Sequence, residues 1–438
     1  MTLLDDRGMQ QYLTDGYVTV QTDFSPEFHR WIRDQADEIF ETDGNPQNDI
    51  FPRIPELGRV WMHPNVRGVL TSILGPEYIM HPHRHCHLTR PFKAAQNNHK
   101  DSYEDDENVR HHRSRWAMAL YYPQDVTEEM GPSAVTPGSQ YYREKESVDG
   151  LEEVLLCGPA GTVTVVHYDL WHRATENQTD EKRFMMKFLF CRMAEPQRPS
   201  WQANGGPEEG FGRHEKICPH LWQWYAGGTG SGNDRIDSGR VLDLTQIFRE
   251  GSEPERLDAA YALGAVGAVE ALMEALFEEA RANRDENLKR KHTNVSQLDA
   301  GYGLSTAGVA AVPALVDALG DPDWWVRAAV VDILGDIGLP AQTAVPDITN
   351  ALNDASAWVR RNAIEALGTM GVRAKSAVSA LAGALQDDDV RVRHNAALAL
   401  AKMGADALNA VPELEVATKD ENRYVRGLSR IALDRVRS

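Results

Sequence analysis

The stretch GTVTVVHYDLWHRATENQTDEKRFMMKFLF, residues 161–190, decides how the first part of this 438-residue chain is interpreted. It holds two apolar runs rich in β-branched and aromatic residues, separated by polar and turn-forming residues, which is typical of two strands joined by a connection. Similar runs predict strands at 16–20, 77–90 and 115–122, and helical spacing predicts helices near 26–41 and 64–75. Many strands with a few helices favour a β-sandwich or barrel with helical support.

The second part of the chain carries an internal repeat of 33 residues (354 − 321 = 33). The residues in phase are Asp321, Asp354, Asp387 and Asp420; Arg327, Arg360, Arg393 and Arg426; Gly338, Gly371 and Gly404; and Pro313, Pro346 and Pro412. Each unit is typical of two helices, one starting near the proline and the other capped by the aspartate and ended by the glycine. This pattern predicts an all-α HEAT-like solenoid, and we interpret the Asp and Arg positions as a structural ladder between neighbouring units rather than a charged binding face.

Composition restricts the domain plan and the partners. Glycine-rich polar stretches place a linker at 228–252, between a first domain at 1–227 and the repeats at 253–438. The net charge of −19 (46 − 65) gives no basic excess, so nucleic-acid binding is not expected. No run of about 18 apolar residues predicts a membrane span, and the start resembles no secretory leader. The four cysteines form no CxxC pair, which fits a reducing cytoplasm.

A His-x-Asp pair followed by a distant histidine indicates a metal centre. His99 and Asp101 come shortly after a predicted strand, and His172 lies 71 residues beyond Asp101 (172 − 101 = 71). Two imidazoles and one carboxylate on one face of a non-haem Fe(II) leave three positions open. Arg183 follows on the next predicted strand, where a guanidinium could grip the far carboxylate of a dicarboxylic cosubstrate. We therefore predict that His99, Asp101 and His172 are the catalytic metal ligands and that Arg183 binds the cofactor.

A second His-x-Asp pair, His167 and Asp169, competes for this role. Only His214 and His220 stand downstream of it as a third ligand, and no arginine follows either at a similar offset. The spacing therefore favours the first pair.

These motifs resemble the phytanoyl-CoA dioxygenase family of Fe(II)/2-oxoglutarate oxygenases over roughly residues 8–200. The likeness is carried by YLTDGYVTV (12–20), the first His-x-Asp pair, RWAMALYYPQDVTEEMGPSAVTPGSQ (115–140) and GTVTVVHYDLWHRATENQTDEKRF (161–184). The resemblance implies a double-stranded β-helix of jelly-roll or cupin type with flanking helices, and Fe(II), 2-oxoglutarate and O₂ as the reagents.

The resemblance also assigns further positions. Trp116 is expected to line the cosubstrate pocket. Thr175, next to Ala174 where the family has a small hydroxyl residue, is expected to take part in cosubstrate binding. Gln140 replaces a histidine of the family pattern. Asp101 is retained, which disfavours the halogenating variants of the family that lack this carboxylate.

Two more groups are candidates for substrate contacts. His81, His83, His85 and His87 share one parity, so in a strand they would face one side. They could form a zinc-type site, but we interpret them as a polar pocket wall, with His85 or His87 near the cosubstrate or substrate. The run SYEDDENVRHHRSR at 102–115 is most simply a solvated loop, and His111, His112, Arg113 or Arg115 could meet an anionic substrate.

The sequence thus predicts an iron- and 2-oxoglutarate-dependent dioxygenase that hydroxylates, or otherwise oxidises, an unactivated C–H bond of a small organic molecule, with specialised metabolism as one setting for it. The repeats would bind a protein partner, a substrate carrier or another copy of the chain. Two alternatives stay open. One is a protein or peptide hydroxylase whose repeats recruit the substrate, and the other is a catalytically inactive scaffold.

Overall fold

The computed structural model describes residues 1–101, 111–207, 210–228, 238–287 and 298–438, which fall into two compact units. The first unit comprises Met1–Asp101, Ser114–Arg192 and Pro199–Cys218, apart from residues 208–209. The second comprises residues 111–113, Met193–Arg198 and the described part of 219–438. Within the predicted linker, residues 238–250 form a helix, and residues 229–237 lie outside the described part of the chain.

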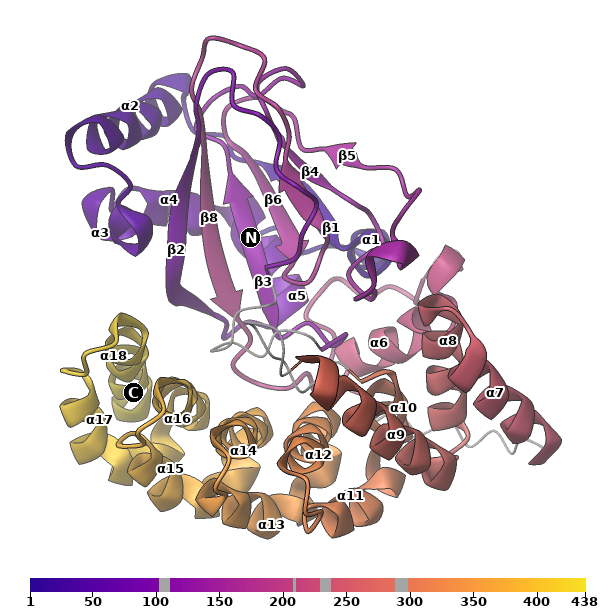
Figure 1. The fold of residues 1–438 in the computed structure, drawn as a ribbon. Coiled ribbons are helices and arrows are strands. Elements are labelled where there is room, and N and C mark those ends of the chain that lie inside the picture. The colour runs from indigo at the N-terminus through magenta and orange to yellow at the C-terminus, as the bar shows by residue number, and fades with distance from the viewer. Residues whose placement is uncertain (102–110, 208–209, 229–237, 288–297) are drawn as a thin grey trace. The chain divides into compact units, whose positions relative to one another are not determined.

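The first unit is built on two antiparallel sheets (Figure 1). The larger sheet has the order β1 (Tyr17–Gln21), β6 (Thr162–His167), β3 (Trp116–Tyr121), β8 (Arg183–Cys191) and β2 (Ile79–Thr89). The smaller sheet has the order β5 (Val154–Leu155), β4 (Ser133–Val135) and β7 (His172–Ala174). The helices of this unit are α1 (Asp6–Asp15), α2 (Pro26–Thr42), α3 (Ile50–Arg53), α4 (Leu57–Trp61) and α5 (Pro64–Leu74). The predicted β-rich fold of jelly-roll type with flanking helices is confirmed.

Alternation along β8 divides the larger sheet into a helix-covered face and a cavity face. Phe184 packs on Phe40 of α2, with ring centroids 5.9 Å apart, and Phe188 packs on Trp61 of α4 at 4.6 Å. The residues of opposite parity, Arg183, Met185 and Lys187, line a cavity on the other face. Because successive side chains of a strand point to opposite faces, one sequence run supplies both the core and the site.

The second unit is a succession of paired helices, as the repeat predicts (Figure 1). Its helices are α6 (Cys218–Tyr225, of which Cys218 belongs to the first unit), α7 (Ser238–Glu250), α8 (Glu253–Ala265), α9 (Val269–Asn287), α10 (Asp299–Ala307), α11 (Val312–Ala318), α12 (Trp324–Ile337), α13 (Val345–Asn350), α14 (Ala357–Met370), α15 (Val378–Ala384), α16 (Val390–Met403), α17 (Val411–Ala417) and α18 (Arg423–Arg437). Pro313, Pro346 and Pro412 lie in the first turn of α11, α13 and α17. No described helix is both long and apolar enough to span a membrane.

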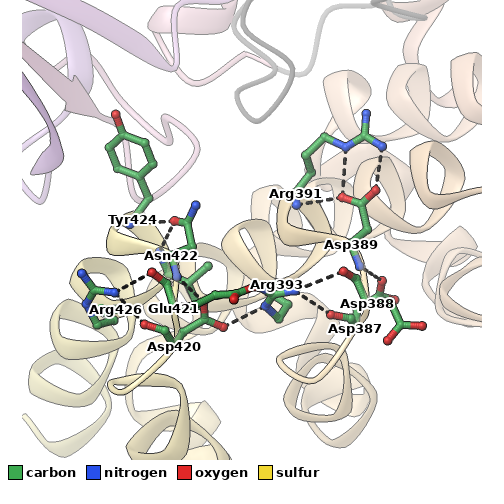
Figure 2. Close-up of polar contacts among 11 residues, drawn as sticks. Asp387, Asp388, Asp389, Arg391, Arg393, Asp420, Glu421, Asn422, Tyr424 and Arg426 are labelled. Atoms are coloured by element: carbon green, nitrogen blue, oxygen red, sulfur yellow. Dashed lines mark hydrogen bonds and ion pairs between the residues drawn. The ribbon is translucent and has the colours of Figure 1, made fainter.

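The repeated aspartates and arginines form a ladder between neighbouring repeats. Arg327, Arg360 and Arg393 bind the carboxylate of the next repeat, Asp354, Asp387 and Asp420, at 2.7, 2.8 and 2.8 Å. Each arginine also donates to the carbonyl oxygen of the aspartate in its own repeat, as for Arg393 and Asp387 at 2.9 Å (Figure 2). The structural interpretation of these residues is therefore confirmed.

Residues 111–113 belong to the helical unit and are anchored there by three different contacts. His111 Nε2 lies 3.0 and 3.1 Å from the two carboxylate oxygens of Asp332 on α12. The ring of His112 stacks on Tyr302 of α10, with centroids 3.6 Å apart, and Arg113 donates to the Ser305 carbonyl oxygen. His111 and His112 are buried. The expectation of a solvated loop is thus wrong for these residues, and the rest of that run, 102–110, lies outside the described part of the chain.

Replacing Asp332 with alanine is expected to loosen this anchor. The change removes hydrogen bonds to a buried imidazole, a loss of about 2 kcal/mol when one partner is charged. Native-state hydrogen exchange should show the amides of residues 111–113 opening with a free energy lower by about that amount. Asp317→Ala on α11, where the carboxylate is exposed, is the control and should leave exchange unchanged. Equal exchange in the two variants would contradict the prediction.

Candidate metal centre

Three predicted ligands from distant parts of the sequence meet in the first unit. His99 and His172 form an antiparallel bridge, in which each backbone N–H donates to the other residue's carbonyl oxygen at 2.9 Å. His99 Nε2 lies 4.0 Å from Asp101 Oδ1, and His172 Nε2 lies 3.5 Å from Asp101 Oδ2. One ligand atom from each residue lies within 4.8 Å of the others, and no second group of this kind occurs among the described residues.

Hydrogen bonds to backbone carbonyls orient both imidazoles. His99 Nδ1 lies 2.9 Å from the Asn97 carbonyl oxygen, and His172 Nδ1 lies 2.9 Å from that of Leu170. A carbonyl can only accept, so each Nδ1 carries the proton and each Nε2 keeps a free lone pair. Burial lowers the pKa of His99, which favours the neutral ring that a metal requires. Both histidines are thus prepared as nitrogen ligands.

The residue between His99 and Asp101, Lys100, bonds to partners outside the group of three ligands. Lys100 Nζ donates to Asp169 Oδ2 at 2.7 Å and to the Tyr142 carbonyl oxygen at 2.7 Å, and both charged side chains are buried. Asp169 therefore forms an ion pair behind the candidate metal centre, and the competing pair, His167 and Asp169, does not gather a third ligand. The alternative in which His214 or His220 completes a metal site is not supported.

Asp101 is held as a carboxylate by its neighbours. Lys187 Nζ on β8 donates to Asp101 Oδ2 at 2.8 Å. Burial alone would raise the pKa of Asp101, but the Lys187 ammonium outweighs it and holds the pKa well below its usual range. A negative ligand is therefore present across the physiological pH range.

Arg183 is the first residue of β8, and one of its guanidinium nitrogens has no hydrogen-bond partner among the described residues. Its Nε and Nη2 donate to the Gly131 carbonyl oxygen at 3.0 and 2.6 Å. Its Nη1 is buried and has no hydrogen-bond partner in the part of the chain that the structure describes. The side chain is 1% exposed yet lines the same cavity as the three ligands. A buried guanidinium with an unpaired N–H fits an anionic group that enters from the cavity.

The cavity has a volume of about 730 Å³, including its open mouth. Polar and charged side chains lie near the three ligands, and apolar ones form much of the remaining wall: Met118, Leu120, Val135, Val166, Leu170 and Met185. Such a mixture suits a small organic molecule held by apolar contacts with a few polar groups fixing its orientation.

Of the remaining predicted site residues, only His87 lines the cavity that holds the three ligands. His87 lines the cavity, and burial together with the Lys187 charge lowers its pKa well below the usual value. His85 lies next to it, with ring centroids 5.9 Å apart, but does not line the cavity. The four alternating histidines do not converge as a metal group in the described residues, so the zinc alternative is not supported.

Trp116, Thr175, His111 and Arg115 do not line the cavity. Trp116 shares the face of Met118 and Leu120, but it pairs in register with Cys191, at the end of β8 opposite to Arg183, and its ring packs edge-on against His81 at 5.3 Å. Thr175 Oγ1 donates to the Pro132 carbonyl oxygen at 2.8 Å, whereas its neighbour Ala174 is a lining residue. Arg115 is buried and accepts a backbone hydrogen bond from Arg192, and His111 is held by the helical unit.

Sequence reasoning missed Lys187, together with Lys93 and Gln96 near the mouth. For Lys187 a signal was present, because it stands four residues after Arg183 on the same strand and so shares its face. Lys93 and Gln96 lie outside the named strands, where no periodicity predicts orientation.

His214 is a buried histidine outside the metal centre. Its ring packs edge-on against Tyr141 at 4.8 Å, and neither nitrogen has a hydrogen-bond partner among the described residues. Burial, with a contribution from Arg213, lowers its pKa from 6.5 to about 4. In the unfolded chain this histidine takes up a proton below pH 6.5, whereas in the folded chain it does not until pH 4, so stability falls as the pH falls through this window.

The His214→Phe variant is expected to lose less stability in acid. Between pH 6.5 and pH 5 the native histidine should account for a loss of about 2 kcal/mol, at 1.36 kcal/mol per pH unit. Urea unfolding of both proteins at the two pH values measures the difference. An identical pH dependence in the variant would assign the acid sensitivity to other groups.

Family models match two separate parts of the chain. Residues 12–185 match the family model described as phytanoyl-CoA dioxygenase (PhyH), and residues 311–339 and 345–434 match models of HEAT repeats. The N-terminal unit is therefore a PhyH domain, and HEAT repeats follow it. No curated protein sequence matches the chain.

Solved structures give distant matches. The non-heme alpha-ketoglutarate-dependent carbocyclase SnoK from nogalamycin biosynthesis is 20% identical, with 46% of this chain and 92% of that chain covered and a TM-score of 0.37. EctD from S. alaskensis with bound Fe is 18% identical, with 49% and 81% covered and a TM-score of 0.37. The non-heme monooxygenase ThoJ, as a nickel complex, is 15% identical, with 45% and 84% covered and a TM-score of 0.35.

Proposed function

We propose that this protein is an Fe(II)/2-oxoglutarate-dependent dioxygenase that hydroxylates an unactivated C–H bond of a small organic molecule. One observation carries the proposal: three converging ligand atoms and the unpaired Nη1 of Arg183 share a single cavity. The match of residues 12–185 to the PhyH family supports it.

The donor set fits a ferrous ion. Two neutral imidazole nitrogens and one carboxylate oxygen form the facial arrangement typical of non-haem iron oxygenases, in which the remaining positions are open. His99, Asp101 and His172 would hold the metal. Bound together, iron, 2-oxoglutarate and O₂ supply the oxidising chemistry, and the protein supplies binding, orientation and exclusion of side reactions.

Arg183 would bind the far carboxylate of 2-oxoglutarate. Its hydrogen bonds to the Gly131 carbonyl oxygen fix the guanidinium plane, so that Nη1 can donate to an anion without reorganisation. Burial lowers the pKa of Arg183, but an arginine stays charged in proteins. A dianion entering this cavity would therefore meet a fixed cation at one end and the metal at the other.

The helical repeats would serve interaction rather than chemistry. We propose that they bind a protein partner, a substrate carrier or a second copy of the chain, since repeat proteins present extended binding surfaces. We place the protein in the cytoplasm, and its four free cysteines are compatible with a reducing compartment.

The test is anaerobic binding followed by turnover. Fe(II)-loaded protein should develop a visible absorption band when 2-oxoglutarate is added, because a keto acid chelating iron absorbs there. On admission of air, succinate release should rise with candidate small metabolites. A keto acid without the far carboxylate, such as 2-oxobutanoate, is the control and should bind far more weakly. Absence of both iron binding and the band would refute the proposal.

A further inference from the structure

Lys187 stands directly against a predicted metal ligand. It lies on β8, which is hydrogen-bonded to β3 on one side and β2 on the other, with Leu120 and His85 as its register partners. Its Nζ donates to Asp101 Oδ2 at 2.8 Å, and both side chains are largely buried, at 13% and 10% exposed. A strand inside a sheet holds its side chains in place, so this contact is a built feature of the cavity.

The two oxygens of Asp101 have different surroundings. Oδ1 lies 4.0 Å from His99 Nε2, whereas Oδ2 lies 3.5 Å from His172 Nε2 and is the acceptor for Lys187. A carboxylate can hold a cation through one oxygen or through both. An oxygen that already accepts a charged hydrogen bond is a poorer metal ligand, so Oδ1 is the freer of the two.

The number of oxygens used by Asp101 matters for the proposed reaction. Iron has six coordination positions, and three protein ligands leave three of them open. A chelating keto acid needs two of these positions, and O₂ needs the third. A carboxylate that bound through both oxygens would take one of these positions. The open face therefore depends on something that restrains Asp101.

We propose that Lys187 is a positioning residue that occupies Oδ2 of Asp101 and so keeps this carboxylate a one-point metal ligand. The inference rests on the proposed function, because it presupposes a divalent metal at this centre. The positive charge of Lys187 also repels the metal ion that Asp101 would bind. It therefore lowers metal affinity while preserving the positions that the cosubstrate needs.

Lys187→Met tests the inference on the full-length protein. The change removes the ammonium with little change in side-chain length, and Lys187→Arg is the conservative variant that can still donate to Oδ2. Lys182→Met is the matched control. Lys182 immediately precedes β8, bonds to Asp37 and to Glu41, the latter at 2.8 Å, and does not line the cavity. Co(II) is the probe, since its visible spectrum reports coordination number and geometry.

Lys187→Met is expected to bind Co(II) at least about tenfold more tightly by calorimetry. Removing one charge roughly 5 Å from a dication has about this effect even with water-like screening, and a buried pair is screened less. Its Co(II) spectrum should differ from that of the native protein, and its Co(II) form should bind 2-oxoglutarate more weakly. Lys187→Arg should restore the native spectrum, and Lys182→Met should match the native protein throughout.

The outcomes separate the two proposals. If the native protein binds no Co(II), Mn(II) or Fe(II), the proposed function fails. If the native protein binds Co(II) and Lys187→Met, shown by circular dichroism to be folded, has the native spectrum and an equal or lower Co(II) affinity, only the role of Lys187 is overturned.

Discussion

Asp101→Ala should abolish 2-oxoglutarate turnover and lower the affinity for Fe(II) or Mn(II) by at least about 100-fold. Even changes to residues that merely support metal ligands cost 10- to 100-fold, and this change removes the single carboxylate of the three-residue ligand group. It also leaves the Lys187 ammonium facing two imidazoles with its carboxylate partner gone. Loss of the carboxylate and the unpaired ammonium charge both weaken the binding of a divalent metal ion at this position.

Calorimetric titration with Mn(II) and an assay of succinate release measure the effect. Asp169→Ala is the control, because Asp169 belongs to the other His-x-Asp pair and bonds to Lys100. That variant should lose stability and still bind one metal ion per chain. Native metal affinity in Asp101→Ala, or loss of the metal site in a folded Asp169→Ala protein, would assign the centre to the other pair.

Arg183→Met should raise the 2-oxoglutarate concentration required for binding by roughly 30-fold or more. Truncating one partner of a buried charged hydrogen-bond pair costs about 2–5 kcal/mol, and each 1.4 kcal/mol is tenfold. Arg183→Lys should recover only part of the loss, since an ammonium keeps the charge but lacks the planar fork of a guanidinium. Titration of the Fe(II) protein with 2-oxoglutarate under anaerobic conditions gives the affinities.

Arg173→Met is the matched control for this experiment. Arg173 also lines the cavity, but its Nε and Nη2 are bonded to Glu153 at 2.8 and 2.7 Å. Its loss should leave 2-oxoglutarate affinity within a few-fold of the native value. The Arg183→Met protein should also no longer distinguish 2-oxoglutarate from 2-oxobutanoate. Retained discrimination would show that another residue holds the far carboxylate.

Local periodicity made a large part of the fold predictable. The 33-residue phase located the helical repeats, and the second apolar run of the stretch 161–190 located β8, an interior strand of the larger sheet. The short strands β4, β5 and β7, of two or three residues each, were not predicted. Segments of that length carry no periodic signal, and they become strands only because a neighbour supplies their hydrogen bonds.

Spacing and resemblance predicted the three residues that converge in the structure, but they misjudged other candidates. The convergence of His99, Asp101 and His172 follows the predicted order of ligands. His111 was a candidate contact for an anionic substrate, whereas the structure pairs it with Asp332, 221 residues away. Trp116 was expected at the pocket, but it pairs with Cys191, at the end of β8 far from Arg183, and packs against His81 instead.

The sequence by itself determined the repeat unit, the main strands, and which residue types could bind a metal and a dicarboxylate. These properties depend on neighbours within a few residues, and such neighbours are adjacent in the sequence. Only the tertiary structure decided that Lys187 bonds to Asp101, 86 residues away, and that Asp169 is occupied by Lys100. Pairing of buried charges depends on which strands lie side by side, and that arrangement is set by the packing of the whole unit.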